Sequence, residues 1–190
     1  HIYWMLLQKN GLRADLKRCF PDEYQQLLSL AYYLILEDSS ALSRFSRWAT
    51  IHEHPFGQDI PSQRSSEILR CVTEAAKTEF FRCLARRRKH EEHWASDPTS
   101  ISSYSEQLHQ VKYGHNKDHE PLLQLNLLLL YGKSSNLPFY YRKLAGNIPD
   151  VKTVRTLIAD VSPLGVNKVK LLMDRGFYST ENINAMLSNH

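Results

Sequence analysis

The chain has 190 residues, of which 42% are hydrophobic and 23% are charged, a balance typical of proteins that bury a core. Its formal net charge of +4 permits a nucleic-acid partner without requiring one, and its longest apolar runs, 27–36 and 122–131, are too short to span a bilayer. The first residues lack the pattern of a signal peptide, and three cysteines without CxxC spacing favour reduced thiols, so we expect a cytoplasmic location and no membrane partner.

Residues 1–91 are predicted to form a helical N-terminal domain. Pro21 suits the first turn of a helix that continues to about residue 38. The apolar face predicted for this helix consists of Tyr24, Leu27, Leu28, Ala31, Leu34 and Ile35. Shorter helices are predicted around Phe45 and Trp48, and in the stretches that contain Ile68 and Phe80.

Residues 92–190 have the pattern of a mixed α/β fold, in which a sheet is flanked by helices. A strand is predicted near Trp94, and two further strands, 124–132 and 136–146, are joined by a Gly/Ser/Asn loop that suits a hairpin. A helix through Leu157 and Val161 then leads to a strand over 168–174. A crossover helix between two strands predicts parallel pairing.

The chain ends with a predicted helix that Ser179 or Thr180 begins and that carries Ile183, Met186 and Leu187. Just before it, Asp174 stands where the apolar run of residues 171–173 stops. Asp97 follows the Trp94 strand in a similar way. If these two strands are neighbours, both carboxylates project into one cleft.

Two nearby carboxylates repel each other unless cations lie between them, and ligand sets made only of oxygen favour Mg²⁺ or Mn²⁺. Spacing alone favours a simpler interpretation, in which Asp97 and Asp174 are unrelated aspartates in turns. The choice between these interpretations depends on whether the two strands pair.

Three stretches resemble the DDE transposases of bacterial insertion sequences, in the group with a DRGFYS second motif. They are DPTSISSYSE (97–106), the segment 113–151, and LLMDRGFYSTENI (171–183). The chain departs from the group's pattern at LAGNIPDV, where Leu144 and Ala145 precede the Gly, and at DPTS, where Pro98 follows Asp97. The resemblance covers essentially the whole chain.

This resemblance implies a ribonuclease H-like core over 92–190, with Asp97 on the first strand and Asp174 on the fourth as catalytic residues that bind Mg²⁺ or Mn²⁺. The third acid of such enzymes is a Glu within a Tyr–Arg–Glu–Lys pattern on a later helix. No such pattern occurs before His190, so the expectation is a C-terminally truncated and catalytically incomplete fragment.

The implied function is DNA transposition, in which strands are cut at insertion-sequence ends and transferred to target DNA. The implied partners are both of these double-stranded DNAs and a second copy of the chain in a synaptic complex, in the nucleoid region of the cytoplasm. Two alternatives stay open: a ribonuclease H-fold nuclease that cuts without strand transfer, and a DNA-binding protein that keeps the fold without catalysis.

Several basic residues are candidates for contacts with DNA phosphates. They are Lys112, His115, Lys117, Arg175, Arg86 and Arg87. A polar loop explains the first three equally well, a solvated turn explains Arg175, and a solvated helix end explains the last two. The patterns His52–Glu53–His54 and HEEH (90–93) invite a zinc interpretation, but neither has HExxH spacing.

Overall fold

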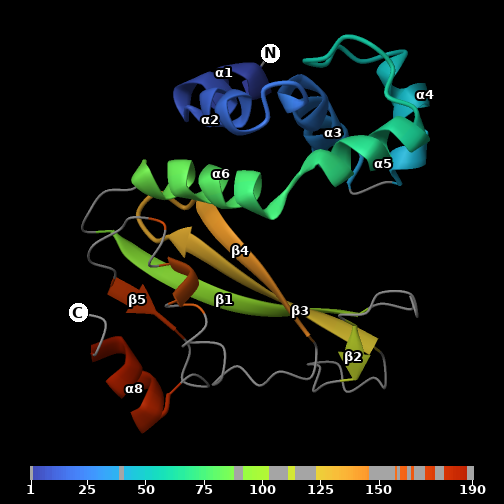
Figure 1. The fold of residues 1–190 in the computed structure, drawn as a ribbon. Helices are drawn as coiled ribbons and strands as arrows, with labels where there is room; N and C mark the ends of the chain where they lie inside the picture. The colour runs from blue at the N-terminus through green and yellow to red at the C-terminus, as the bar shows by residue number, and fades with distance from the viewer. Residues whose placement is uncertain are drawn as a thin grey trace. The chain divides into compact units, whose positions relative to one another are not determined.

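The structure is a computed structural model that describes residues 2–38, 41–87, 92–102, 111–113, 123–145, 157, 159–161, 164, 170–173 and 178–187. The chain forms two compact units, 1–83 and 84–190, and the boundary between them falls inside helix α6. Figure 1 draws the helices of the first unit from blue to green and the strands of the second from green to red. Among the described residues, no helix is both long enough and apolar enough to cross a lipid bilayer.

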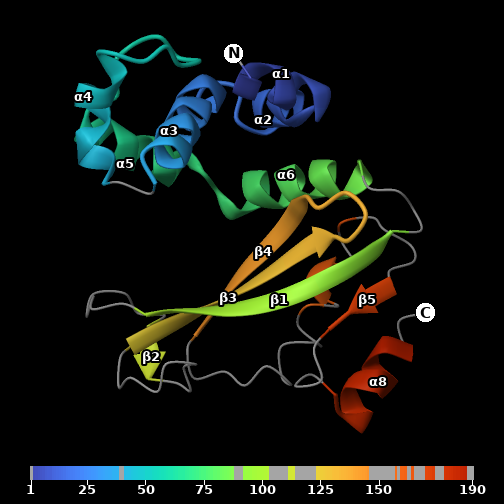
Figure 2. The same ribbon diagram turned by 180° about the vertical axis from the view of Figure 1, so that it is seen from behind.

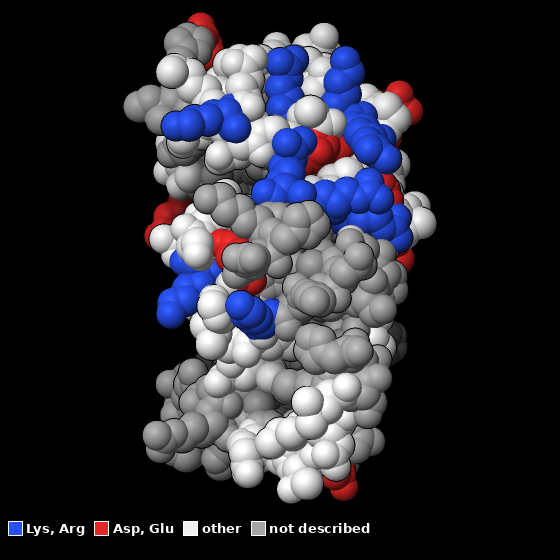
Figure 3. Space-filling view, turned by 90° about the vertical axis from the view of Figure 1, so that its left-hand side faces the viewer, with Lys and Arg blue, Asp and Glu red and all other residues white. Residues whose placement is uncertain are grey.

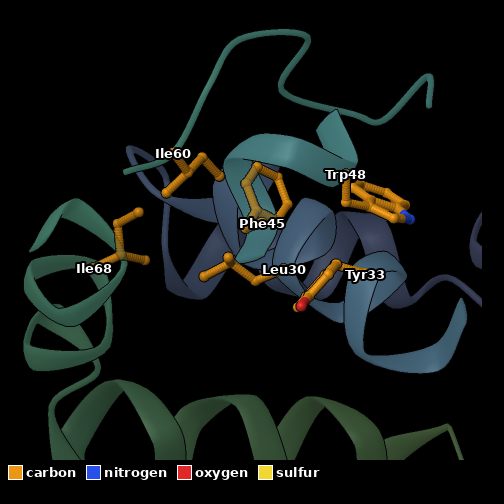
Figure 4. Packing of buried hydrophobic residues seen from close by; sticks show 6 residues of the cluster. All are labelled: Leu30, Tyr33, Phe45, Trp48, Ile60 and Ile68. Atoms are coloured by element: carbon orange, nitrogen blue, oxygen red, sulfur yellow. The ribbon is translucent and has the colours of Figure 1, made fainter. Parts of the chain in front are cut away.

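The N-terminal unit is built of short helices around one apolar cluster. Its elements are α1 (Ile2–Lys9), α2 (Leu12–Cys19), α3 (Tyr24–Leu36), the 3-10 turn η1 (Leu42–Arg44), α4 (Phe45–Ala49), α5 (Ser62–Cys71) and most of α6 (Glu74–Arg86). The cluster consists of Leu30, Tyr33, Phe45, Trp48, Ile60 and Ile68, drawn as sticks in Figure 4. Burial of these side chains from three helices and the loop before α5 holds the unit together.

Tyr33 organises this cluster. Its ring lies 5.7 Å from that of Phe45 and 5.5 Å from that of Trp48, both in edge-to-face geometry. Its hydroxyl donates a hydrogen bond to the Ala41 carbonyl oxygen at 2.8 Å. The aromatic ring therefore contributes to the core while its polar end is satisfied by the backbone.

The prediction of the buried face of α3 is wrong for three of its six residues, which are exposed. Leu34 and Ile35 are 38% and 61% exposed, and Ala31 is also exposed. Instead, Leu30 and Tyr33 are buried on the next stripe of the helix. The helix is apolar almost all round, so its periodicity did not identify which stripe packs inward.

The C-terminal unit contains a mixed sheet, seen from two sides in Figures 1 and 2. Its strands are β1 (His93–Ser102), β2 (Lys112–Tyr113), β3 (Leu123–Gly132), β4 (Pro138–Ala145) and β5 (Lys170–Leu172). Strand β3 lies antiparallel to β1, β4 and β2, whereas β5 lies parallel to β1. The mixed α/β fold confirms the coarse prediction from the sequence, but the parallel partner of β5 is β1 and not β4, the strand that precedes the predicted crossover helix.

The predicted hairpin is confirmed as the β3–β4 connection. The Gly132 N–H donates to the Leu137 carbonyl at 3.1 Å, and the Asn136 N–H donates to the Gly132 carbonyl at 2.8 Å. Asn136 has a φ of 52°, a left-handed conformation that asparagine tolerates better than most residues. A register shift between Leu130 and Tyr131 marks a bulge just before this turn.

One face of the sheet is well buried. Trp94, Leu128 and Leu130 are at most 2% exposed, and the Trp94 ring lies 4.2 Å from that of Phe139. Leu157 and Val161 have helical backbone and are buried, as expected, while Val154 and Ile158 of the same predicted helix lie outside the described residues.

The last helix, α8 (Thr180–Leu187), begins where the sequence predicts. Ser179 caps it, because its hydroxyl accepts a hydrogen bond from the Asn182 N–H at 3.1 Å. The Ile183 N–H donates to the Ser179 carbonyl, which begins the helical ladder.

Candidate active site

The parallel pair of β1 and β5 is the part of the fold on which the candidate site depends. Three successive residues of each strand are partners: His93 with Lys170, Trp94 with Leu171, and Ala95 with Leu172. In each pair the two partners are 77 positions apart in the sequence, as His93 and Lys170 are. Asp97 and Asp174 are separated by this same number.

Asp97 was expected to follow the Trp94 strand, but it lies within β1, which continues to Ser102, and its backbone lies opposite Leu129 of β3. The description of Asp97 is limited to its backbone, and Asp174 and Arg175 lie outside the described residues. Strand β5 is thus described up to two positions before Asp174. The pairing of the two strands, on which the sequence interpretation depended, is present.

Among the described residues, no three His, Cys, Asp or Glu side chains come together to hold a metal ion. This finding does not include the carboxylates of Asp97 and Asp174, because they are not among the groups that the structure describes. The zinc interpretation of His52 and His54 is opposed by their contacts. The His52 ring stacks on Trp48 at 4.6 Å and its Nδ1 lies 3.0 Å from the Trp48 carbonyl oxygen, while the His54 ring packs on Phe45 at 5.3 Å.

Lys112 lies at the opposite end of β1 from β5. It is exposed on β2 and paired with Gln124, whose neighbour on β1 is Ser102. Ser102 lies five steps along the extended strand from Asp97, a distance of roughly 16 Å. A DNA contact by Lys112 therefore belongs to a surface well removed from the β1–β5 pair.

Of the other basic candidates, Arg86 and Arg87 are exposed at the end of α6, where the Arg87 N–H donates to the Leu84 carbonyl. His115 and Lys117 lie outside the described residues, as Arg175 does. Figure 3 shows Lys and Arg side chains gathered in the upper part of one face of the molecule. Part of the positive charge of the N-terminal unit is engaged in ion pairs, since Glu79 accepts from both Arg18, at 3.2 Å, and Arg82.

Sequence reasoning missed a polar network that ties β4 to the helical residues near Asp160. The sequence pattern was compatible with a simple position for Asp160 on the helix surface. Instead, its Oδ2 accepts hydrogen bonds from the Tyr140 hydroxyl, at 2.8 Å, and from the Arg142 guanidinium. Burial and this carboxylate raise the pKa of Tyr140, and the hydrogen bond with Asp160 raises the pKa of Arg142.

Glu92 was considered only as part of the HEEH pattern, but it has a structural role. It is 7% exposed, and its Oε1 accepts a hydrogen bond from the Ser135 N–H at 2.6 Å. Ser135 is 43 residues further along the chain, so no local signal could have revealed this contact. Glu92 therefore secures the β3–β4 turn.

Comparisons with known protein families, with curated proteins and with solved structures found no match to this chain.

Proposed function

We propose that this chain carries two acidic ligands of a metal-dependent DNA-cleaving site of the DDE transposase kind, and that these ligands are Asp97 and Asp174. The observation that supports the proposal best is the shared separation of 77 residues between β1 and β5. If the β1–β5 pairing continues for two residues beyond Leu172 with the same separation of 77, Asp97 is the partner of Asp174.

Neighbouring strands lie about 4.8 Å apart, so opposite residues bring their side chains close together. Two carboxylates at that distance repel each other, and a divalent cation between them removes the repulsion. Their oxygens are the ligands that Mg²⁺ and Mn²⁺ prefer. The donor set therefore fits the metal that the resemblance implies.

The order of the strands supports a ribonuclease H-like core. Leaving aside β2, which has two residues, the sheet order is β4, β3, β1, β5, and β1 and β5 are the first and fourth strands in the chain. The resemblance expects its two aspartates on the first and fourth strands. In this chain these strands are adjacent and parallel.

Asp97 and Asp174 would hold divalent ions, whose chemistry would be to activate a water and to stabilise the leaving 3′ oxygen of a DNA strand. The contribution of the protein is to hold the two carboxylates on strands whose positions are fixed by the sheet. Displacement of catalytic groups by about 1 Å is enough to cost roughly 10²-fold in rate. Strand transfer to target DNA is part of the same proposal, since it repeats the displacement with the freed 3′-hydroxyl as nucleophile.

Manganese binding tests the assignment in the 190-residue chain itself. Mn²⁺ is paramagnetic, so when bound it broadens the NMR signals of nearby amides. We expect the amide signals of Ala95 and Leu172 to broaden at Mn²⁺ concentrations that leave those of Lys112 and Tyr113 sharp. Asp97→Asn and Asp174→Asn are each expected to remove this selective broadening, whereas the exposed Asp22→Asn is the matched control and keeps it.

Selective broadening that survives both substitutions would defeat the metal assignment. Binding of a DNA duplex, measured by fluorescence anisotropy, separates the other functions. Loss of Mn²⁺ binding with retained DNA binding is expected for both Asn variants. DNA binding by a wild-type chain that shows no selective broadening would favour the non-catalytic DNA-binding protein.

A further inference from the structure

Two cysteines, Cys19 and Cys83, lie where the end of α2 packs on α6, and both belong to the N-terminal unit. The residues on either side of Cys19 contact α6 residues that lie about one turn before Cys83. The Arg18 guanidinium donates to Glu79 Oε1 at 3.2 Å, the Cys83 thiol lies 3.9 Å from the same oxygen, and the Phe20 ring lies 6.2 Å from that of Phe80. An ion pair on one side of Cys19 and an aromatic contact on the other therefore hold it against the face of α6 that carries Cys83.

The two thiols differ in their exposure to solvent. Cys83 is 6% exposed, and its Sγ lies 3.9 Å from the Glu79 carboxylate, whereas Cys19 is only partly buried. The third cysteine, Cys71 on α5, is exposed. All three are free thiols, so the pair is present in its reduced form.

We propose that Cys19 and Cys83 form an oxidisable dithiol site that reacts with low-molecular-weight disulfides and closes to a reversible disulfide between α2 and α6. The proposal does not depend on the DNA-cleaving function. A disulfide requires two cysteines whose backbones lie close together, and the Arg18–Glu79 and Phe20–Phe80 contacts hold Cys19 against the face of α6 that carries Cys83.

The reaction is an ordinary thiol–disulfide exchange in two steps. Cys19, the more accessible thiol, loses its proton and attacks one sulfur of the small disulfide, which forms a mixed disulfide and releases one small thiolate. The Cys83 thiolate then attacks the Cys19 sulfur, which forms the internal disulfide and releases the second small thiolate. The two protons from the cysteines end on the two small thiols, so two cysteine thiols are oxidised and one small disulfide is reduced.

The surroundings set the pH at which this reaction proceeds. Burial, the neighbouring Cys83 thiol and the Glu79 and Asp15 carboxylates raise the pKa of Cys19 to about 11. The attacking thiolate is therefore scarce at neutral pH, and its fraction rises about tenfold for each pH unit below this pKa. A neutral small disulfide avoids repulsion by the two carboxylates, so bis(2-hydroxyethyl) disulfide is the probe of choice.

The test uses the full 190-residue chain with Cys71→Ser, which removes the exposed thiol. We expect treatment at pH 8.5 to give a monomer that has lost the mass of two hydrogens and whose non-reducing peptide map links Cys19 to Cys83. The formation rate is expected to rise about tenfold from pH 7.5 to pH 8.5. Because the bond joins positions 64 residues apart in the sequence, Tm of the N-terminal unit is expected to rise by at least about 5 °C and to return on reduction.

Cys71→Ser/Cys19→Ser and Cys71→Ser/Cys83→Ser are the matched controls, and neither should form the link or gain in Tm. A mixed disulfide that persists on Cys19 would overturn the proposal. So would a wild-type chain in which Cys71 reacts completely while Cys19 and Cys83 stay reduced at pH 8.5.

Discussion

The carboxylate of Glu92 and the backbone N–H of Ser135 are joined by a hydrogen bond of 2.6 Å that fixes the β3–β4 turn against the start of β1. A second bond supports the same junction, because the Lys133 N–H donates to the His93 carbonyl at 2.9 Å. The first strand of the sheet is thus attached at its beginning to a turn that lies some forty residues further along the chain.

Removal of the Glu92 carboxylate should destabilise this junction. Glu92→Ala leaves the Ser135 N–H without its acceptor and is expected to cost about 2 kcal/mol of unfolding free energy, while Glu92→Gln, which keeps an acceptor oxygen, costs about half as much. Urea unfolding with hydrogen exchange of residues 123–145 as the readout measures the loss. Lys133→Ala, at an exposed position of the same turn, is the control, and an equal loss there would contradict the role given to Glu92.

Because Gly132 has no side chain, the Glu92 carboxylate occupies the space that a Cβ at position 132 would fill. A Cβ at this position would lie 2.4 Å from Glu92 Oε2 and 2.5 Å from Ser135 Oγ. Gly132→Ala should therefore displace the carboxylate and cost about as much as Glu92→Ala, roughly 2 kcal/mol. The double variant should cost clearly less than the sum of the two single ones. Additive losses in the double-mutant cycle would show that the glycine acts independently of Glu92.

Tyr140 should give the C-terminal unit a pH dependence above pH 10. Its pKa is raised in the folded chain by burial and by Asp160, so the folded state keeps a proton that the unfolded state releases. Stability should then fall as the pH rises above about 10, the ordinary tyrosine pKa. Tyr140→Phe should flatten this part of the profile, measured as the urea midpoint of residues 123–145 between pH 9 and pH 11. An unchanged slope would refute the contribution of Tyr140.

His54 should make the N-terminal unit sensitive to mild acid. Burial against Phe45 and Trp48 lowers its pKa, and Asp59 opposes this shift in part. The unfolded state therefore takes up a proton first, and stability falls as the pH drops below about 6.5. Urea unfolding between pH 7.5 and pH 5, followed by hydrogen exchange of the amides of α3 and α4, reports the change. His54→Phe should reduce the slope and Asp59→Asn should steepen it; the reverse order would contradict the assignment.

The apolar cluster of the N-terminal unit should tolerate little loss of volume. Ile68 is fully buried in it, so Ile68→Ala is expected to cost about 3 kcal/mol through lost burial and the cavity left behind. Ile51 is 79% exposed, and Ile51→Ala should change the unfolding free energy by less than about 0.5 kcal/mol. Urea denaturation of the two variants side by side provides the comparison. Equal losses would mean that the cluster does not govern the stability of this unit.

The sequence was informative where a local pattern determines structure. The Gly132–Asn136 hairpin loop, the cap at Ser179 and the strand at Trp94 are all present, because turn residues, capping hydroxyls and strand periodicity act over a few residues. The face of α3 was misjudged because Leu30, Leu34 and Ile35 are equally apolar. Contacts of Tyr33 with Phe45 and Trp48 select the buried stripe, and these are tertiary contacts.

The candidate site was predictable only in part for the same reason. The motif around Asp174 indicated a strand end, but the crossover pattern predicted parallel pairing with the strand before the helix, and the pairing of β5 with β1 was only a condition of the site. The partners of Glu92 and Asp160 lie 43 and about 20 residues away, on elements whose register the sequence does not encode locally. Networks of this kind depend on how the strands are aligned.

The wide separation of β1 and β5 along the chain has a consequence for the order of folding. Strands β3 and β4 are joined by a short turn, so their pairing closes a small loop, whereas the β1–β5 ladder joins segments 77 residues apart and has a larger loop-closure entropy. The three antiparallel strands are therefore expected to assemble early and β5 to dock late. Assembly of this part of the sheet is then a late kinetic event, and β1 offers an open edge until it takes place.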